Sequence, residues 1–236
     1  MRAIACVLLL IWVPASALGL GENQLYVGDP STVKPGLTQL QLYTDATYPA
    51  RARLGGMSLR RGLTTNTDLK LAYSYLWNFS GPDASLGPNI GLKWRFAGDG
   101  RMKPSLAVSA LCVLNQESGG RAHKSDYGAS LIGSCPTPVG VVLANYGHVW
   151  VGDNIPDLRY VGLALVRPVA KRTLVALEYS DFERVRNSGP NPPKRQIAAG
   201  MIYKGGSGWN YGLQVGYLPE GVKVKWHTTL GVATYF

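Results

Sequence analysis

The chain is poor in charged residues, cysteine and histidine for its length. Of its 236 residues only 16% are charged, and cysteine and histidine occur three times each. Soluble domains carry roughly 25% charged residues, so a large part of this protein's surface is predicted not to face water. Three cysteines are too few for a disulfide-stapled scaffold, and an apolar content of 46% excludes a disordered chain.

Long apolar runs are missing beyond the N-terminus. The longest later piece, residues 139–144, is far shorter than the stretch of roughly 18 residues that a membrane-spanning helix needs. At the N-terminus, one basic residue precedes an apolar run over residues 3–13 and small residues up to Gly19. This pattern is typical of a secretory signal peptide. We therefore predict that residues 1–19 are removed on export, by cleavage after Ala17 or Gly19.

Positive charge is in excess, with 24 Lys and Arg against 14 Asp and Glu and a net charge of +10. A charge of this sign fits nucleic acid, an anionic membrane surface or acidic solutes. Because an exported chain works outside the cytoplasm, we expect no nucleic-acid partner.

The dominant pattern is alternation with a period of two, which predicts β-strands. In residues 69–77 (LKLAYSYLW) every odd position is large and apolar or aromatic, whereas the even positions are mostly small or polar. Marking every such run predicts about twelve strands. They cover roughly residues 36–44, 52–63, 67–77, 88–97, 104–115, 127–135, 139–151, 158–167, 173–180, 195–204, 208–218 and 222–236.

The connections between these strands alternate in length. Short turns, such as those at 64–66 and 205–207, alternate with long polar loops near 78–87, 116–126 and 181–194. Short turns on one side, longer loops on the other and aromatic residues near strand ends are typical of a transmembrane β-barrel. We predict an all-β fold, an antiparallel up-and-down transmembrane β-barrel over residues 36–236. Residues 20–35 form either a periplasmic tail or a plug inside the lumen.

A soluble secreted β-sandwich would show a similar alternation. A sandwich, however, places charge on its water face and does not need aromatic residues at both strand ends. Here the polar positions are rich in Gly, Ala, Ser and Asn with few charges, which suits a confined lumen. The terminal Phe236, in phase with the apolar face of the last strand, is common in barrels exported to a bacterial outer membrane. We expect that location, with lipid and lipopolysaccharide around the barrel and the barrel assembly machinery recognising the strand that ends in Phe236.

Several stretches resemble one known family, the outer-membrane proteins named for the meta-cleavage (MetA) pathway of phenol degradation. Residues 59–64 (LRRGLT) with 67–73 (TDLKLAY) are similar to the family hairpin RYGLTDRLDLGLGY. Residues 91–96 (GLKWRF) are similar to the family stretch GLKYRF. Residues 29–36, residues 143–147 and the terminal strand agree with the family in order and spacing. The chain departs from the family at Arg61, where an aromatic residue is usual. The resemblance implies a protein for uptake of aromatic or other hydrophobic small molecules.

The lumen is where we expect function, because the inward residues of a barrel determine its selectivity. The predicted lumen-lining set is mostly basic, and a basic lumen attracts anions. Four apolar residues in the same phase, Leu76, Leu111, Val113 and Ile202, offer patches for an aromatic ring. The set comprises Arg60, Lys70, Lys93, Arg95, Glu178, Gln196, Asn210, Gln214, Lys223, Lys225 and His227.

These residues predict an outer-membrane channel or transporter that takes up small hydrophobic, aromatic or anionic solutes. The alternative is a structural or adhesive outer-membrane barrel, in which inward charges pair across a plugged lumen. A third possibility is an outer-membrane lipid hydrolase, which needs a serine, a histidine and a group that orients the histidine. His123 and Ser125 have a suitable spacing but fall in a long polar loop flanked by Gly119 and Gly120. His148, near Tyr146 and Trp150 at a strand end, is interpreted as an interface residue, and no such grouping is visible around His227. No His, Cys or Asp spacing resembles a zinc or calcium site. We expect no enzyme, no catalytic residue, no metal and no cofactor.

Overall fold

A computed structural model describes residues 28–49, 52–78, 84–100, 103–114, 117–118, 121–122, 126–150, 157–184, 195–206, 208–219 and 224–236. The predicted signal peptide, residues 20–27, His123 and Lys223 lie outside the described residues. Within these described ranges, no helix has the length and apolar character needed to cross a membrane.

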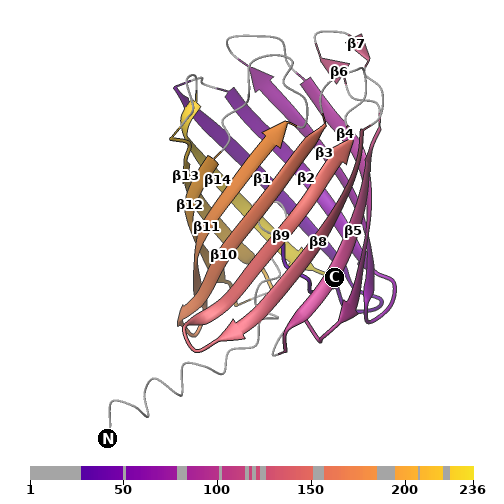
Figure 1. The fold of residues 1–236 in the computed structure, drawn as a ribbon, viewed down its shortest axis with the longest axis vertical. Helices are drawn as coiled ribbons and strands as arrows, with labels where there is room; N and C mark the ends of the chain where they lie inside the picture. Colours follow the sequence, from indigo (N-terminus) through magenta and orange to yellow (C-terminus); the bar gives the residue numbers. More distant parts are fainter. Residues whose placement is uncertain are drawn as a thin grey trace, which may run out of the picture.

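Twelve long strands form one closed antiparallel barrel, as the alternation predicted (Figure 1). Each strand pairs with its neighbours along the chain, β5 pairs with β8, and β14 pairs with β1 to complete the ring. The strands are β1 (Thr38–Pro49), β2 (Ala52–Gly62), β3 (Thr67–Asn78), β4 (Ala84–Ala97), β5 (Ser105–Val113), β8 (Asp126–Thr137), β9 (Gly140–Trp150), β10 (Leu158–Ala170), β11 (Thr173–Arg184), β12 (Arg195–Lys204), β13 (Asn210–Tyr217) and β14 (Val224–Tyr235).

Two further strands of two residues each, β6 (Glu117–Ser118) and β7 (Arg121–Ala122), lie in the predicted loop 116–126. They pair with each other, and β6 also pairs with the start of β4, so they extend the wall above the rim (Figure 1). A two-residue strand is too short to produce an alternating pattern, which is why the sequence did not predict them.

The C-terminus closes the ring. The main-chain groups of Thr38 and Phe236 exchange two hydrogen bonds, of 2.8 and 3.0 Å, beside the first pair of the β1–β14 ladder, Gln39 with Tyr235. Closure pairs the two edge strands, which would otherwise present unsatisfied backbone groups in an apolar medium.

The two faces of the wall differ as a membrane barrel requires. Large apolar side chains at mid-strand point outward, with Leu71 and Leu92 both 47% exposed. Aromatic residues gather toward both ends of the strands on the same outer face. They are Trp77, Tyr127, Trp150 and Trp226 at the end with the long loops, and Trp94, Phe96, Tyr203 and Phe236 at the end with the short turns.

The inner face is buried and mixed in character. An apolar cluster of Leu143, Val166, Leu174 and Ile202, with three alanines, occupies the inside of β9–β12 and β14. The other inward positions are largely polar. Part of the barrel is therefore filled by its own side chains, as expected between filled eight-stranded barrels and open porins.

Inward glycines give room to rings from neighbouring strands. The ring of Tyr160 lies over Gly147, where an added Cβ would be 2.1 Å from a ring carbon. His227 covers Gly216 in the same way, with its Nε2 atom 1.8 Å from the corresponding position. The small residues of the polar phase thus serve packing inside the lumen.

Candidate functional site

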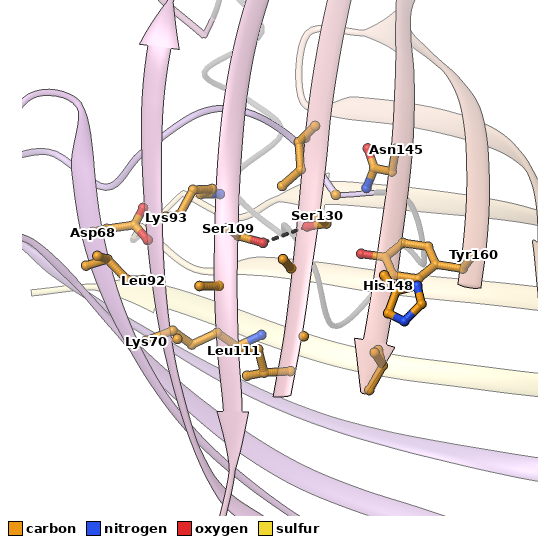
Figure 2. Close-up of a pocket in the computed structure, with 17 residues that line it drawn as sticks. Asp68, Lys70, Leu92, Lys93, Ser109, Leu111, Ser130, Asn145, His148 and Tyr160 are labelled. Carbon is orange, nitrogen blue, oxygen red and sulfur yellow. Dashed lines mark hydrogen bonds between the residues drawn. The ribbon is translucent and has the colours of Figure 1, made fainter. Parts of the chain in front are cut away.

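A cavity of about 220 Å³ lies inside the barrel, against the inner faces of β3, β4, β5, β8, β9 and β10. Figure 2 shows Lys93 and Asn145 toward one end of it, Lys70 and Leu111 toward the other, and Ser109 and Ser130 between them. Since these strands are consecutive around the ring, their alternating inward residues converge on one concave wall.

The lining combines cationic, hydroxyl and apolar groups. Lys70 on β3 and Lys93 on β4 supply positive charge, and the hydroxyls of Ser109 and Ser130 share a hydrogen bond of 2.7 Å across β5 and β8. Leu111, a residue of the predicted apolar patch, also lines the cavity. Such a mixture can hold a small solute that has both a negative group and an apolar body.

Two glycines, Gly91 and Gly128, line the cavity in register with Lys70 and Leu111. A Cβ added at Gly91 would meet nothing closer than 3.4 Å, and one at Gly128 nothing closer than 3.6 Å. The backbone is therefore exposed to the cavity without steric pressure from neighbouring side chains.

The ring of Tyr160 on β10 forms another edge of the cavity, and β9 borders it with its main chain at His148. A ring nitrogen of His148, Nε2, lies 3.3 Å from Asp157 Oδ2, and the ring packs on Trp150 with centroids 4.7 Å apart. These contacts hold the imidazole in place. His148 has the same strand phase as Trp150, whose side chain is 48% exposed on the outer face, as expected of an interface residue.

The N-terminal segment, defined here as residues 28–35, lies inside the barrel at the end with the short turns. With its amide oxygen and nitrogen exchanged, the orientation that satisfies both, Asn145 on β9 pairs with both main-chain groups of Gly28, donating to the oxygen at 3.0 Å and accepting from the nitrogen at 2.5 Å. Lys93 Nζ donates to the main-chain oxygen of Asp29 at 3.0 Å. Gly28, Asp68 and Lys93 also line the cavity, so the segment and its anchors form one of its walls.

A buried ion pair anchors the same segment on the β2–β3 side. Arg60 Nη2 lies 2.7 Å from Asp68 Oδ2, and the two side chains are 4% and 1% exposed. The same carboxylate oxygen accepts a hydrogen bond from the main-chain nitrogen of Val33 at 3.1 Å, while Arg60 donates to the oxygen of Ser31 at 3.3 Å. Asp68 therefore joins the barrel wall to the segment.

Asp29 is buried among these groups. Burial raises the pKa of its carboxyl above the usual range, although Lys93, the hydrogen bonds from Ser31 and the charge of Arg60 act in the opposite direction. Ser31 donates to the carboxylate from its main-chain nitrogen at 2.8 Å and from its hydroxyl at 2.5 Å. The charged form of Asp29 is therefore less stable in the docked segment than in water.

Lys93 and Arg95, two residues apart on one strand, have different surroundings. Lys93 is 3% exposed and holds the segment. Arg95 is half-buried and donates to Thr65 O at 2.7 Å and to Asn66 Oδ1 at 2.9 Å, in the turn between β2 and β3. The structure places Lys93 at the cavity and Arg95 at a turn.

The remaining predicted site residues lie away from this cavity. Glu178, Gln196 and Gln214 are buried on β11, β12 and β13, and Asn210 is half-buried at the start of β13. Lys225 is exposed, next to an irregularity in the β1–β14 ladder. Of the predicted apolar patch, Ile202 belongs to the buried cluster, Val113 is half-buried, and the side chain of Leu76 lies outside the described part.

His227 belongs to a separate polar group on β14 and β1. Its Nδ1 atom lies 2.9 Å from Asp45 Oδ2, and Thr229 donates to the same oxygen at 2.5 Å. The other ring nitrogen faces Gly216, which offers no nucleophile. The arrangement orients the ring and joins the two strands that close the barrel.

Sequence reasoning missed three buried acids, Asp29, Asp45 and Asp68, which are 3%, 8% and 1% exposed. Asp68 precedes Lys70 by two residues and so has the same inward phase, from which its position in the lumen could have been predicted. Asp45 was missed because the first strand was predicted to end at residue 44, whereas β1 continues to Pro49. The lumen is consequently more balanced in charge than the predicted set, whose acidic member was Glu178.

Among the residues that the structure describes, no group of three or more His, Cys, Asp or Glu side chains is arranged to hold a metal ion. Both cysteines of the described strands, Cys112 and Cys135, have free thiols.

No family model matches the chain, and no curated protein matches it. Several solved structures are similar to the chain. The NanC porin is 11% identical with a TM-score of 0.66, and the match covers 83% of this chain and 98% of the porin. An outer membrane channel from Pseudomonas putida F1 is 12% identical with a TM-score of 0.64, covering 89% and 98%. The KdgM porin is 9% identical with a TM-score of 0.60, covering 84% and 99%, and has also been solved in complex with disordered oligogalacturonate.

At these identities the similarity shows a shared fold. The shared fold is the closed antiparallel β-barrel of these outer-membrane channels. The resemblance to the family of the phenol meta-cleavage pathway stays a prediction.

Proposed function

We propose that the protein is an outer-membrane channel for the uptake of small solutes that carry a negative group, with single-ring aromatic acids and acidic sugars as the main classes. The observation that carries the proposal is the cavity inside the barrel, where Lys70 and Lys93 lie close to hydroxyl groups and to Leu111. The cations would attract the negative group, while Leu111 and the ring of Tyr160 would contact the apolar part.

The size of the cavity supports small solutes. Its volume of about 220 Å³ is below the roughly 300–1,000 Å³ of pockets for drug-sized ligands. An apolar cavity of about 150 Å³ is enough to bind benzene. A solute with one ring and a carboxylate therefore suits the cavity, whereas a larger one would have to enlarge it.

The apolar outer face supports contact with outer-membrane lipid, and the ladder between β1 and β14, which ends at Phe236, supports recognition by the barrel assembly machinery. We propose no enzymatic activity.

Uptake into proteoliposomes tests the proposal. Lys70→Met should lower the influx of benzoate about fivefold relative to benzamide, because a partly hydrated ion pair contributes about 1 kcal/mol. Lys171→Met, which removes the same charge from the exposed turn between β10 and β11, is the matched control and should leave both rates unchanged. An equal benzoate to benzamide ratio in the wild type and in Lys70→Met would contradict the proposed role of the cavity.

A further inference from the structure

Three neutral polar residues, Ser180, Gln196 and Gln214, lie on the inner faces of β11, β12 and β13, and we call them the neutral group. Their side chains are buried, with exposures of 2%, 4% and 2%. Within the described part of the chain, the hydroxyl of Ser180, the amide nitrogen of Gln196 and both amide atoms of Gln214 have no hydrogen-bond partner. Buried polar side chains nearly always have one, so three exceptions on adjacent strands need an explanation.

The strand register connects the neutral group to the cavity. Ser180 pairs directly with Gln196 across β11 and β12. On its other side Ser180 pairs with Gly162 of β10, two residues from Tyr160, whose ring borders the cavity. Because Gly162 has no side chain, no side chain at that position separates Tyr160 from Ser180. The neutral group therefore continues the cavity wall beyond β10.

Gln214 extends the neutral group toward the short-turn end. It pairs with Gly200 on β12, which pairs in turn with Ala176 on β11, and both residues are too small to supply a partner for the amide. In the order of strands around the ring, β12 lies six steps out of twelve from β4, so the inner faces of these two strands point toward each other. Gly91 of β4 lines the cavity. The neutral group thus lies beside the cavity and across the lumen from it.

The atoms without partners include both donors and acceptors. The two amide nitrogens only donate, the amide oxygen of Gln214 only accepts, and the hydroxyl of Ser180 does either. A carboxylate would use the donors and leave the Gln214 oxygen without a partner, and an ammonium group would use the oxygen and leave the donors. A hydroxyl group donates and accepts, so it suits the whole set. Water does the same, and a solute hydroxyl that takes the place of water keeps these hydrogen bonds.

We propose that Ser180, Gln196 and Gln214 form a second solute site, which binds hydroxyl groups and makes the channel favour acidic sugars over aromatic acids. The proposal rests on the proposed function and narrows its solute class. The carboxylate of the sugar lies at Lys70, and its ring hydroxyls reach the neutral group past Tyr160.

Binding of two anions to the full-length barrel in detergent micelles tests this site. Glucuronate and cyclohexanecarboxylate both carry a carboxylate on a six-membered ring, but only glucuronate has ring hydroxyls. In isothermal titration calorimetry we expect the wild type to bind glucuronate more tightly. Gln214→Leu should weaken glucuronate binding about fivefold, as expected for the loss of one neutral hydrogen bond, and leave cyclohexanecarboxylate unchanged. Ser180→Ala should have an effect in the same direction.

Gln41→Leu is the matched control. Gln41 on β1 is 1% exposed, but its amide oxygen accepts a hydrogen bond from the hydroxyl of Ser58 at 3.2 Å. The same substitution there should leave both affinities unchanged. It should lower the midpoint of unfolding in guanidinium chloride, because it leaves Ser58 without this acceptor. Gln214→Leu should not lower the midpoint, because the amide that it removes is not bonded to another residue.

Equal affinities of the wild type for the two anions would overturn the hydroxyl site. So would a Gln214→Leu barrel that binds both anions equally weakly, or one whose unfolding midpoint falls as far as that of Gln41→Leu, because the amide would then have a structural role. These measurements require no transport. Failure of the proposed function is seen separately, as a benzoate to benzamide influx ratio that Lys70→Met leaves unchanged.

Discussion

Removal of the Asp68 carboxylate should destabilise the barrel more than any other single change at the segment. Arg60 and Asp68 are 2.7 Å apart with side chains that are 4% and 1% exposed, and breaking such a buried pair from one side costs about 3–5 kcal/mol. Asp68→Ala also removes the acceptor of Val33 N, a group whose lost hydrogen bond costs about 1–3 kcal/mol. Because the two losses share one oxygen they are not additive, and we expect about 3–5 kcal/mol in total.

Equilibrium unfolding in guanidinium chloride, with the barrel in detergent micelles, measures this loss. The double variant Arg60→Met with Asp68→Ala should lose less than Asp68→Ala alone, because it leaves no buried guanidinium facing the gap. A loss below about 1 kcal/mol for Asp68→Ala would refute the reasoning. So would a double variant whose loss equals the sum of the two single losses, since coupled partners cannot be additive.

Three further predictions follow from the wall and the segment. Gly216→Ala should cost about 1–3 kcal/mol in the same unfolding assay, because the new methyl would meet His227 Nε2 at 1.8 Å, whereas Gly91→Ala, with 3.4 Å to its nearest atom, should be nearly neutral. Leu92→Arg, on the lipid face, should cost about 2–4 kcal/mol in lipid vesicles. Since burial raises the pKa of Asp29, docking of the segment is strongest at low pH and weakens as the pH rises through the raised value. The free energy of unfolding in the same assay should fall as the pH rises through that value, and Asp29→Asn should remove this part of the pH dependence.

Strand periodicity is local information, and it predicted the architecture well. Alternation over residues 69–77 placed Leu71 outward and Lys70 inward, and the structure has Leu71 47% exposed and Lys70 at the cavity. The reason is physical: a strand in lipid has two faces in different media, so its sequence must repeat every two residues.

The site could be predicted only in part, because it depends on contacts between distant parts of the chain. The alternation showed that Lys93 faces the lumen. It could not show the hydrogen bond from Lys93 to the main-chain oxygen of Asp29, because a lysine side chain can donate to any acceptor within reach. Likewise no pattern relates Asn145 to Gly28. The alternation therefore predicts which side chains point into the lumen. It does not predict their partners, because those depend on the path of the N-terminal segment.

The central claim is that the lumen conducts small anions. Single-channel recording in a planar bilayer under a potassium chloride gradient measures both the opening and its selectivity. The account predicts stepwise currents whose reversal potential lies toward the equilibrium potential of chloride. Silent bilayers from correctly assembled barrels, or steady currents that prefer potassium, would contradict it.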